Sequence, residues 1–281
     1  MPELPDLLYV QKYLQKNIRG KTIRGAVVQQ PIVLRVAVKQ SIDQALNGKA
    51  VTLVDLHGPF LCIKLSGELD MVLNLMLMGK LQHQRPDEKT EPYLCASFFL
   101  DDSSRLNLCD RQKMAKCYIV PQGEYSAIPS YARQGIDIRS PAFNADLFRS
   151  LAARHRRKQV RVFINDHTIL SSIGNAYADE ILFDARIHPK TFVDSLSAVQ
   201  LDTLFNSIRT VMEDGIRHVA AAGQPIHVKV RDHMKVRMRR GKLCSRCGST
   251  IRREGVRGYD VFFCPRCQPA SRTLFLDWRR I

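Results

Sequence analysis

The sequence predicts an α+β protein of more than one domain, with β-strands first, helices next and a cysteine-rich hairpin near the C-terminus. Its length of 281 residues suggests about two domains. Short apolar runs separated by Gly, Pro, Asn and Asp fill the first 120 residues, which is typical of an antiparallel β-sandwich or barrel. From Pro141 onward apolar residues recur at helical spacing, and four of the eight cysteines lie in one short C-terminal segment.

A helix is expected before the strands, because Leu7, Val10 and Leu14 recur at helical spacing within residues 6–16. The methionine-rich run 71–78 is interpreted as a core strand rather than a cofactor site. The expected strands are Ile23–Val28, Ile32–Val38, Ala50–Leu56, Phe60–Leu65, Met71–Met78, Tyr93–Leu100, Arg105–Leu108 and Lys116–Val120.

A linker is expected around residues 121–140, which contain two prolines and two glycines and lack a sustained period. Beyond it, Leu147, Phe148 and Leu151 form one apolar helical face. Further helices are expected at 174–184, 196–205 and 202–222, the last two forming a helix pair or one broken helix. The expected divisions are a sandwich at 1–122, a linker at 123–140, a helical domain at 141–228 and a cysteine-rich domain at 229–281.

The charge balance indicates a polyanionic partner, because 43 Lys and Arg face 27 Asp and Glu and give a formal net charge of +16. Nucleic acid and a membrane surface are the two candidates. Residues 229–257 hold eleven of the basic residues and only Asp232 and Glu254 as acids, which favours nucleic acid. The sequence has no run of 18 apolar residues and no N-terminal h-region. We expect that the protein neither spans a membrane nor is secreted. We therefore expect a cytoplasmic or nucleoid-associated protein with reduced cysteines.

Two Cys-x2-Cys pairs near the C-terminus predict a metal site. Sixteen residues separate the two pairs, and four thiolates at this spacing suit tetrahedral zinc. Two redox pairs or free thiols are the alternative. A closed four-thiolate site leaves no open position for substrate, so we expect one structural Zn²⁺ that stabilises a short hairpin. The expected ligands are Cys244, Cys247, Cys264 and Cys267, whereas Cys62, Cys95, Cys109 and Cys117 read as buried small apolar residues.

Two further motifs carry possible chemistry. Removal of Met1 would leave Pro2 as a secondary amine able to form an iminium with a sugar aldehyde carbon, and Glu3 could shuttle the proton that opens the sugar ring. Alone this signal is weak, since many chains begin with Met-Pro. Gly174 and Asn175 open an expected helix whose backbone N–H groups suit a phosphate, although an ordinary N-capped core helix is the alternative.

Taken together, MPELPD at the start, GNAYADEILFDARIHP in the middle and the four-cysteine hairpin ending CPRCQ resemble the formamidopyrimidine-DNA glycosylase/endonuclease VIII family of base-excision repair enzymes. The resemblance covers essentially the whole chain. It implies an N-terminal β-sandwich, a helix–two-turn–helix domain and a C-terminal zinc finger. It also implies a monomer that acts on damaged double-stranded DNA, removing a flipped base and cleaving the abasic site as a lyase.

The same resemblance assigns roles to residues. Pro2 would attack C1′ and Glu3 would protonate the sugar ring oxygen. Asp6, where the family more often has Glu, belongs to the same catalytic motif. Asn175 would hold a phosphate beside the flipped nucleotide.

The chain departs from the family at two expected phosphate contacts. Pro59 stands where the family usually has a lysine, and His57 or Lys64 could supply the missing cation. Tyr259 stands where the family commonly has an arginine, and Arg257 could replace that arginine only if the hairpin register differs. Two lost cations should weaken DNA binding and lower its salt slope by about two units.

The residues that would fill the space left by the flipped base also differ from the family pattern. They are Leu77, Gln112 and Met114, and all three can still intrude into the base stack. Gln112 takes the place of an arginine, so we expect relaxed reading of an opposite cytosine.

Three functions remain open at this point. The first is a glycosylase and abasic-site lyase with altered lesion choice, which the retained Pro2, Glu3 and Asn175 favour. The second is a catalytically weakened protein that binds lesions or abasic sites, which Pro59 and Tyr259 favour. The third is a zinc-dependent transcription regulator, which would bind undamaged duplex in a sequence-specific manner.

Overall fold

The computed structural model describes residues 2–38, 40–256 and 258–270. The chain forms two compact units. The first contains the residues up to Arg133 together with Val219–Val230, and the second contains Gln134–His218 and the residues from Arg231 onward.

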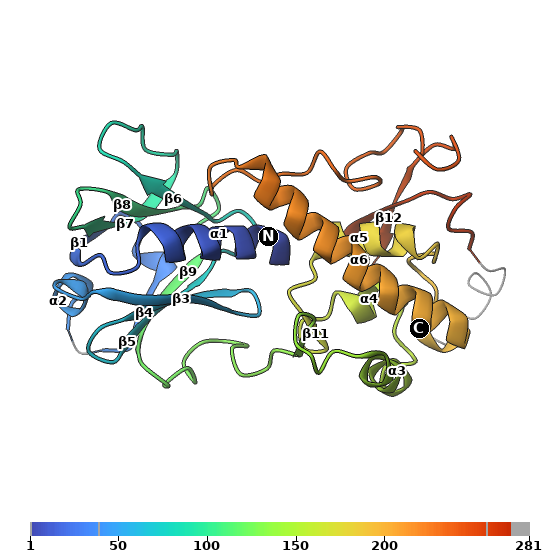
Figure 1. Ribbon diagram of the computed structural model, residues 1–281, viewed down its shortest axis with the longest axis horizontal. Helices are drawn as coiled ribbons and strands as arrows, with labels where there is room; N and C mark the ends of the chain where they lie inside the picture. The colour runs from blue at the N-terminus through green and yellow to red at the C-terminus, as the bar shows by residue number, and fades with distance from the viewer. Residues whose placement is uncertain (1, 39, 257, 271–281) are drawn as a thin grey trace. The chain divides into compact units, whose positions relative to one another are not determined.

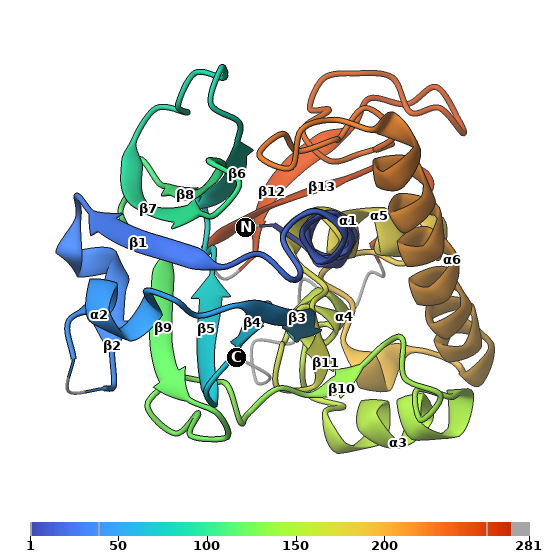
Figure 2. The same ribbon diagram turned by 60° about the vertical axis from the view of Figure 1, so that its left-hand side comes forward.

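The first unit is built on two β-sheets. The strand orders are β1-β7-β8-β6 and β2-β9-β5-β4-β3, and every pairing is antiparallel except the parallel pair β2–β9. The sheets face one another, and α1 lies along the opening between them (Figures 1 and 2). This confirms the predicted sandwich. Its elements are α1 (Leu4–Asn17), β1 (Ile23–Val28), the 3-10 helix η1 (Pro31–Val33), β2 (Leu34–Val36), α2 (Ile42–Leu46), β3 (Val51–His57), β4 (Phe60–Leu65), β5 (Leu69–Asn74), β6 (Lys80–Gln84), β7 (Leu94–Leu100), β8 (Arg105–Cys109) and β9 (Lys116–Pro121).

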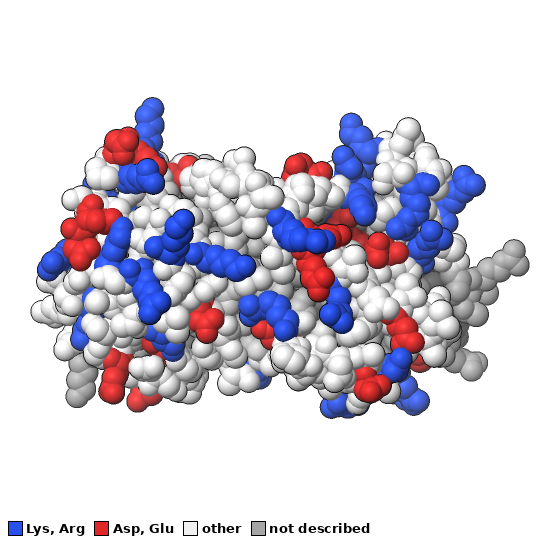
Figure 3. Space-filling view, in the orientation of Figure 1, with Lys and Arg blue, Asp and Glu red and all other residues white. Residues whose placement is uncertain are grey.

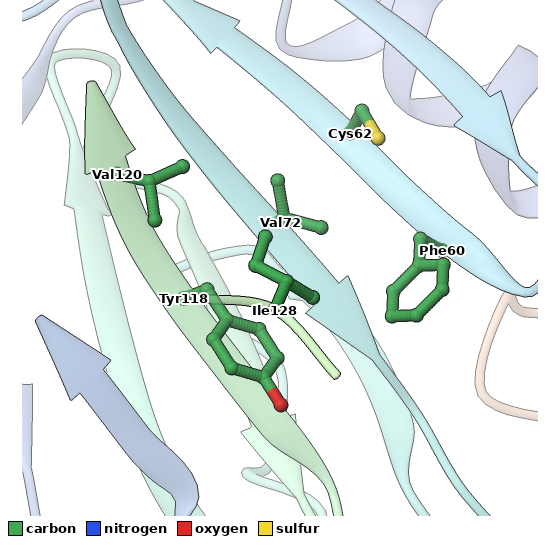
Figure 4. Close-up of a cluster of buried hydrophobic side chains, with 6 residues drawn as sticks. All are labelled: Phe60, Cys62, Val72, Tyr118, Val120 and Ile128. Carbon is green, nitrogen blue, oxygen red and sulfur yellow. The ribbon is translucent and has the colours of Figure 1, made fainter. Parts of the chain in front are cut away.

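The central strands of the five-stranded sheet are buried on both faces, as their nearly continuous apolar sequences require. On the outer face, side chains from β4, β5 and β9 meet Ile128 from the segment that follows β9, as Figure 4 shows. Tyr125 and Tyr131 of that segment pack against the same cluster. Residues 121–133 therefore cover the sheet as an irregular but packed layer. The cluster consists of Phe60, Cys62, Val72, Tyr118, Val120 and Ile128.

The methionine-rich run is not one strand, contrary to the expectation for residues 71–78. The strand ends at Asn74, whose side-chain oxygen accepts the Met76 N–H at 3.0 Å and starts a turn. Met76 has a positive φ of 49°, and the Gly79 N–H closes the turn on the Leu75 carbonyl. A short-range polar contact thus overrides the apolar pattern and places residues 75–79 in a loop.

The second unit contains the helical part and the cysteine-rich hairpin. Residues 198–222 form one continuous helix rather than the expected pair or broken helix. The order of the elements, helices followed by a hairpin, agrees with the prediction. The elements are β10 (Ile136–Asp137), α3 (Ala145–Arg154), α4 (Val160–Ile164), β11 (Leu170–Ser171), α5 (Asn175–Asp184), η2 (Val193–Ser195), α6 (Ala198–Ala222), β12 (Arg252–Val256) and β13 (Tyr259–Phe263). The last residues of α6, from Val219 onward, belong to the first unit.

Gly215 lies inside α6, where glycine costs about 1 kcal/mol relative to alanine. The reason for its presence is the buried ring of Tyr177, on α5. A Cβ atom at position 215 would overlap with that ring. The glycine therefore lets α5 and α6 approach closely.

Basic side chains are distributed over both units, interspersed with acidic ones, on the face drawn in Figure 3. The positive charge is thus not confined to the C-terminal segment. No helix among the described residues is long and apolar enough to cross a membrane.

We expect Gly215→Ala to destabilise the protein by about 1–3 kcal/mol, because the new methyl group collides with the buried ring of Tyr177. Urea unfolding followed by circular dichroism measures the change. Gly255→Ala is the matched control, since position 255 opens onto free space and has no positive φ. Equal stability of the two variants would contradict the packing argument.

Candidate active site and zinc centre

The N-terminus of α1 holds the predicted catalytic residues in a fixed arrangement. Glu3 is the N-cap of the helix and forms a capping box with Asp6, in which each side chain accepts the backbone N–H of the other residue. The Glu3 N–H reaches Asp6 Oδ2 at 2.9 Å. Glu3 is 4% exposed and Asp6 is 7% exposed. Asp6 therefore fixes the backbone from which Pro2 and Glu3 project.

A pocket opens beside this helix start, and all of its lining belongs to the first unit. Pro2 and Asp6 form part of the wall. The segment 226–229, which follows α6 in the chain, forms another part, and no sequence pattern indicated its presence there. The remaining lining residues come from α1, the loop before β6, the start of β6 and the end of α6: Tyr9, Val10, Leu75, Gly79, Lys80, Leu81 and Val219.

Two loops of the sandwich carry the three residues expected to intrude into DNA. Leu77 is 45% exposed on the turn after β5, and Met114 is 37% exposed between β8 and β9, where Gln112 is also exposed. The buried Asp110 carboxylate shapes the second loop, since it accepts the backbone N–H groups of residues 112, 114 and 115 at 2.7–2.9 Å. A Cβ atom at Gly79 would collide with the Ala115 methyl group, so the two loops lie against each other.

His57 and Pro59 occupy the β3–β4 hairpin. Gly58 has a φ of 53° as the first central residue of a two-residue turn, a position that favours glycine. Pro59 is the second central residue and is buried. His57 is half-buried, and its Nε2 lies 2.8 Å from the Tyr131 carbonyl oxygen while the two rings stack at 4.2 Å. One nitrogen of the imidazole is therefore already bonded within the protein.

Lys64 is held inside the first unit rather than presented to solvent as a spare cation. Its Nζ contacts Asp70 Oδ2 at 2.5 Å and the Tyr125 hydroxyl at 2.6 Å. Burial acts to lower the pKa of Lys64, but the hydrogen bonds and charge of these two partners outweigh it and raise the pKa. The lysine stays charged and paired, so it does not replace the cation missing at position 59.

Asn175 lies at the first position of α5, and its side chain has a defined orientation. Its Oδ1 accepts hydrogen bonds from Arg161 at 2.9 Å and from Asn165 at 3.1 Å. Since the oxygen faces these donors, the Nδ2 group is directed away from them. That donor group is the part of Asn175 available to an acceptor such as a phosphate oxygen.

Asn175 is held by a buried network of charged residues that its motif does not reveal. Asp179 accepts from Arg161 at 3.1 Å and from Arg237 at 2.8 Å, and it also accepts the Phe262 backbone N–H. The next residue, Glu180, accepts three consecutive backbone N–H groups of the segment 235–237. An arginine on an otherwise apolar helix such as α4 is the only signal that pointed to this network.

The four C-terminal cysteines converge as their spacing predicted. Their Sγ atoms all lie within 4.8 Å of one another, with Cys247–Cys264 at 3.4 Å and Cys244–Cys267 at 3.9 Å. A tetrahedral zinc with Zn–S bonds of 2.3 Å has S–S edges of about 3.8 Å. The donor set therefore fits zinc in both chemistry and spacing.

The zinc hairpin is anchored to α5. The Phe183 side chain packs in one cluster with Phe262, Ile251 and two of the cysteines, and the Arg246 guanidinium lies 4.4 Å from the Phe183 ring centre. Tyr259 begins β13 and is 55% exposed. Arg257, the other candidate at the hairpin tip, lies outside the described residues.

The β-sandwich, the helical part and the four-cysteine hairpin define a zinc-finger protein with two compact units. Three family models match the chain in sequence order: the formamidopyrimidine-DNA glycosylase N-terminal domain over residues 1–117, the H2TH domain of the same family over 135–224, and the zinc finger found in FPG and IleRS over 241–270.

Relatives match over nearly the full chain. The formamidopyrimidine-DNA glycosylase of Heliobacterium modesticaldum is 31% identical over 95% of this chain and 100% of its own, and that of Rhodococcus jostii is 29% identical over 97% of each. This chain belongs to the formamidopyrimidine-DNA glycosylase family, which confirms the resemblance inferred from its motifs.

Solved structures show the same fold. The Thermus thermophilus member is 26% identical with a TM-score of 0.83, and the Lactococcus lactis member is 23% identical with a TM-score of 0.84. Each comparison covers 96% of this chain and 100% of the other. The Lactococcus lactis protein was solved non-covalently bound to DNA containing an abasic site.

We expect Cys267→Ser to lose one equivalent of zinc per chain, because three thiolates no longer close the tetrahedron. Metal analysis of the purified protein measures the loss, and hydrogen exchange should show loss of protection over residues 244–264. Cys95→Ala, which removes a buried thiol from β7, is the control and should retain its zinc. Unchanged zinc content in Cys267→Ser would refute the assignment.

Proposed function

We propose that this protein is a DNA glycosylase with abasic-site lyase activity that acts on damaged double-stranded DNA in base excision repair. Membership of the formamidopyrimidine-DNA glycosylase family supports this proposal. The observation that carries it is the placement of Pro2 and Glu3 at the capped and buried start of α1, with Pro2 lining a pocket.

The chemistry follows from the properties of these two residues. Once Met1 has been removed, the secondary amine of Pro2 attacks C1′ of the damaged nucleotide as the glycosidic bond breaks. Glu3 protonates the ring oxygen, so the sugar opens and an iminium forms between Pro2 and C1′. The iminium acidifies the 2′ proton, and its removal eliminates the 3′ phosphate and cleaves the strand.

Asp6 acts in this scheme as a positioning residue. Its carboxylate accepts the Glu3 N–H and its backbone N–H bonds the Glu3 side chain, so it sets where the Glu3 carboxylate lies. The shorter aspartate is sufficient for this role, because the capping box requires only one carboxylate at the third helical position.

DNA contacts are proposed for residues of both units. Asn175 offers its Nδ2 group to a phosphate, and the exposed Leu77, Gln112 and Met114 would occupy the space left by a flipped base. His57 would use its remaining ring nitrogen at a phosphate. Arg257 and Tyr259, at the hairpin tip, complete the proposed set.

The four cysteines would hold one structural Zn²⁺, since four thiolates leave no coordination position for a substrate. The zinc stabilises the hairpin and takes no part in the cleavage steps. We further propose that the protein is monomeric and acts inside the cell, where DNA is found.

We expect wild-type protein with a free Pro2 to form a covalent complex with abasic-site duplex in the presence of borohydride, because borohydride reduces an iminium to a stable amine. Pro2→Gly should reduce trapping at least about a hundredfold, a loss of about 2.7 kcal/mol of transition-state stabilisation. The assay uses untagged protein, on duplexes with an abasic site, a formamidopyrimidine or an oxidised pyrimidine. Equal trapping by wild type and Pro2→Gly would overturn the proposed nucleophile.

A second candidate function is a lesion- or abasic-site-binding protein with little catalysis. Two observations favour it: Pro59 is buried and uncharged where the family usually has a lysine, and Lys64 is committed to Asp70 and Tyr125. Such a protein would bind abasic DNA tightly and leave the strand intact.

Pro59→Lys separates the two functions. In a working enzyme that lacks one phosphate contact, it should tighten DNA binding and steepen its salt dependence by about one unit, with faster trapping through Pro2. Pro59→Gln, which also removes the proline ring but adds no charge, is the control. Tight binding without trapping in wild type, Pro59→Lys and Pro59→Gln alike would favour the lesion-binding protein.

A further inference from the structure

We infer that His218, Asp232 and His233 form a second metal site, which binds a divalent first-row transition cation such as Zn²⁺. All three residues belong to the second unit. His218 is on α6, and the other two follow the segment that leaves this helix. None of the three is among the four cysteine ligands, and none has a role in the proposed cleavage of DNA.

The three ligand atoms have the spacing that a cation requires. His218 Nε2 lies 3.1 Å from Asp232 Oδ1, and His233 Nδ1 lies 3.9 Å from the same oxygen. One atom from each residue lies within 4.8 Å of the others. Metal–ligand bonds near 2.1 Å separate neighbouring ligands by about 3–3.5 Å, so the longer separations would have to shorten by about 1 Å when a cation binds.

The chemistry of the donors favours a transition metal over Ca²⁺ or Mg²⁺. Two imidazoles and one carboxylate suit zinc, iron and their neighbours, whereas the harder cations prefer oxygen ligands throughout. Three protein ligands leave positions for water, so the site differs in kind from the closed four-thiolate centre.

His233 has the outer contact expected of a metal-bound histidine. Its Nε2 lies 3.0 Å from the Tyr177 hydroxyl, which leaves Nδ1 facing Asp232. Tyr177 is itself 1% exposed and is fixed by its contact with Gly215. The orientation of one ligand is therefore set by a buried residue.

Acidic side chains outnumber basic ones in the lining of the pocket beside this site. A pocket of about 220 Å³ borders both histidines, and three carboxylates line it against one ammonium, that of Lys235. All three carboxylates have partners within the protein: Glu180 accepts backbone N–H groups of residues 235–237, Asp184 accepts from Ser207, and Asp214 is paired with Arg217. The site therefore relies on its own three ligands, and the pocket has room for the waters that would complete the coordination of a cation.

Binding of metal to untagged protein with a loaded zinc finger tests this inference. Titration with Zn²⁺, followed by calorimetry and metal analysis, should give a second equivalent per chain. Co²⁺ should give weak visible bands without the sulfur charge transfer of the cysteine site. Because no DNA is present, the result does not depend on the proposed glycosylase activity.

Variants locate the site. His218→Gln and His233→Gln should each abolish the second equivalent or weaken it more than a hundredfold, and Tyr177→Phe should weaken it about tenfold through the lost outer contact. Asp232→Asn changes an exposed side chain, so we expect the variant to fold normally. Weaker metal binding by this variant would indicate that the Asp232 carboxylate is a ligand. His155→Gln, on a histidine elsewhere in the unit, should bind as wild type.

A stoichiometry of one in wild type would overturn the inference, and so would equal uptake by wild type and the His218→Gln/His233→Gln double variant. In either case the contacts of Asp232 with His218 and His233 are ordinary polar contacts and not a metal site. Retention of the finger zinc and an unchanged melting temperature show that a variant is folded.

Discussion

The second unit depends on one buried carboxylate, that of Asp179. It receives two guanidinium groups and a backbone N–H, from α4, from the segment after α6 and from β13. A charge removed from water is tolerated only when it is paired and fully hydrogen-bonded, so these elements must meet at this point or leave it unsatisfied. The same Arg161 that pairs with Asp179 orients Asn175. The position of a proposed phosphate ligand therefore depends on the contact that fixes the zinc hairpin.

Carboxylates also satisfy buried hydrogen-bond donors in the first unit, at the start of α1. The first turn of any helix leaves N–H groups without partners, and here two acids satisfy them reciprocally. Pro2 and Glu3 thereby gain a rigid backbone although they lie near a chain end, where disorder is common. In both units, buried carboxylates accept hydrogen bonds from backbone N–H or guanidinium groups. These bonds fix the position of the residues that are proposed to act on DNA.

Much of the fold was predictable because its signals are local. The strands of the five-stranded sheet carry apolar runs, and the zinc ligands are set by a fixed covalent spacing. The strand β6 was missed because its sequence, Lys-Leu-Gln-His-Gln, is mostly polar. Gln82 and Gln84 are buried through hydrogen bonds to Asn107 and to the segment 88–91. The pocket segment 226–229 was missed because most residues that line the pocket with it lie more than a hundred residues away in the chain.

The site itself was predictable only as a set of candidates. A motif can indicate Asn175, but it cannot show which way the amide points or that Arg161 sets it. Nor could spacing show that Lys64 is committed to Asp70, since a lysine on a strand is equally consistent with solvent exposure. Contacts between distant residues decide these matters.

The path of the chain between the two units has a consequence for how they can be separated. The polypeptide passes from the first unit to the second after Arg133, returns for residues 219–230 and leaves again. A fragment that ends at Arg133 would lack Ile226 and Val228, and would leave the wall beside Pro2 incomplete. A single proteolytic cut between residues 133 and 134 would not yield two independent pieces. Neither compact unit can therefore be obtained as one continuous segment of the chain.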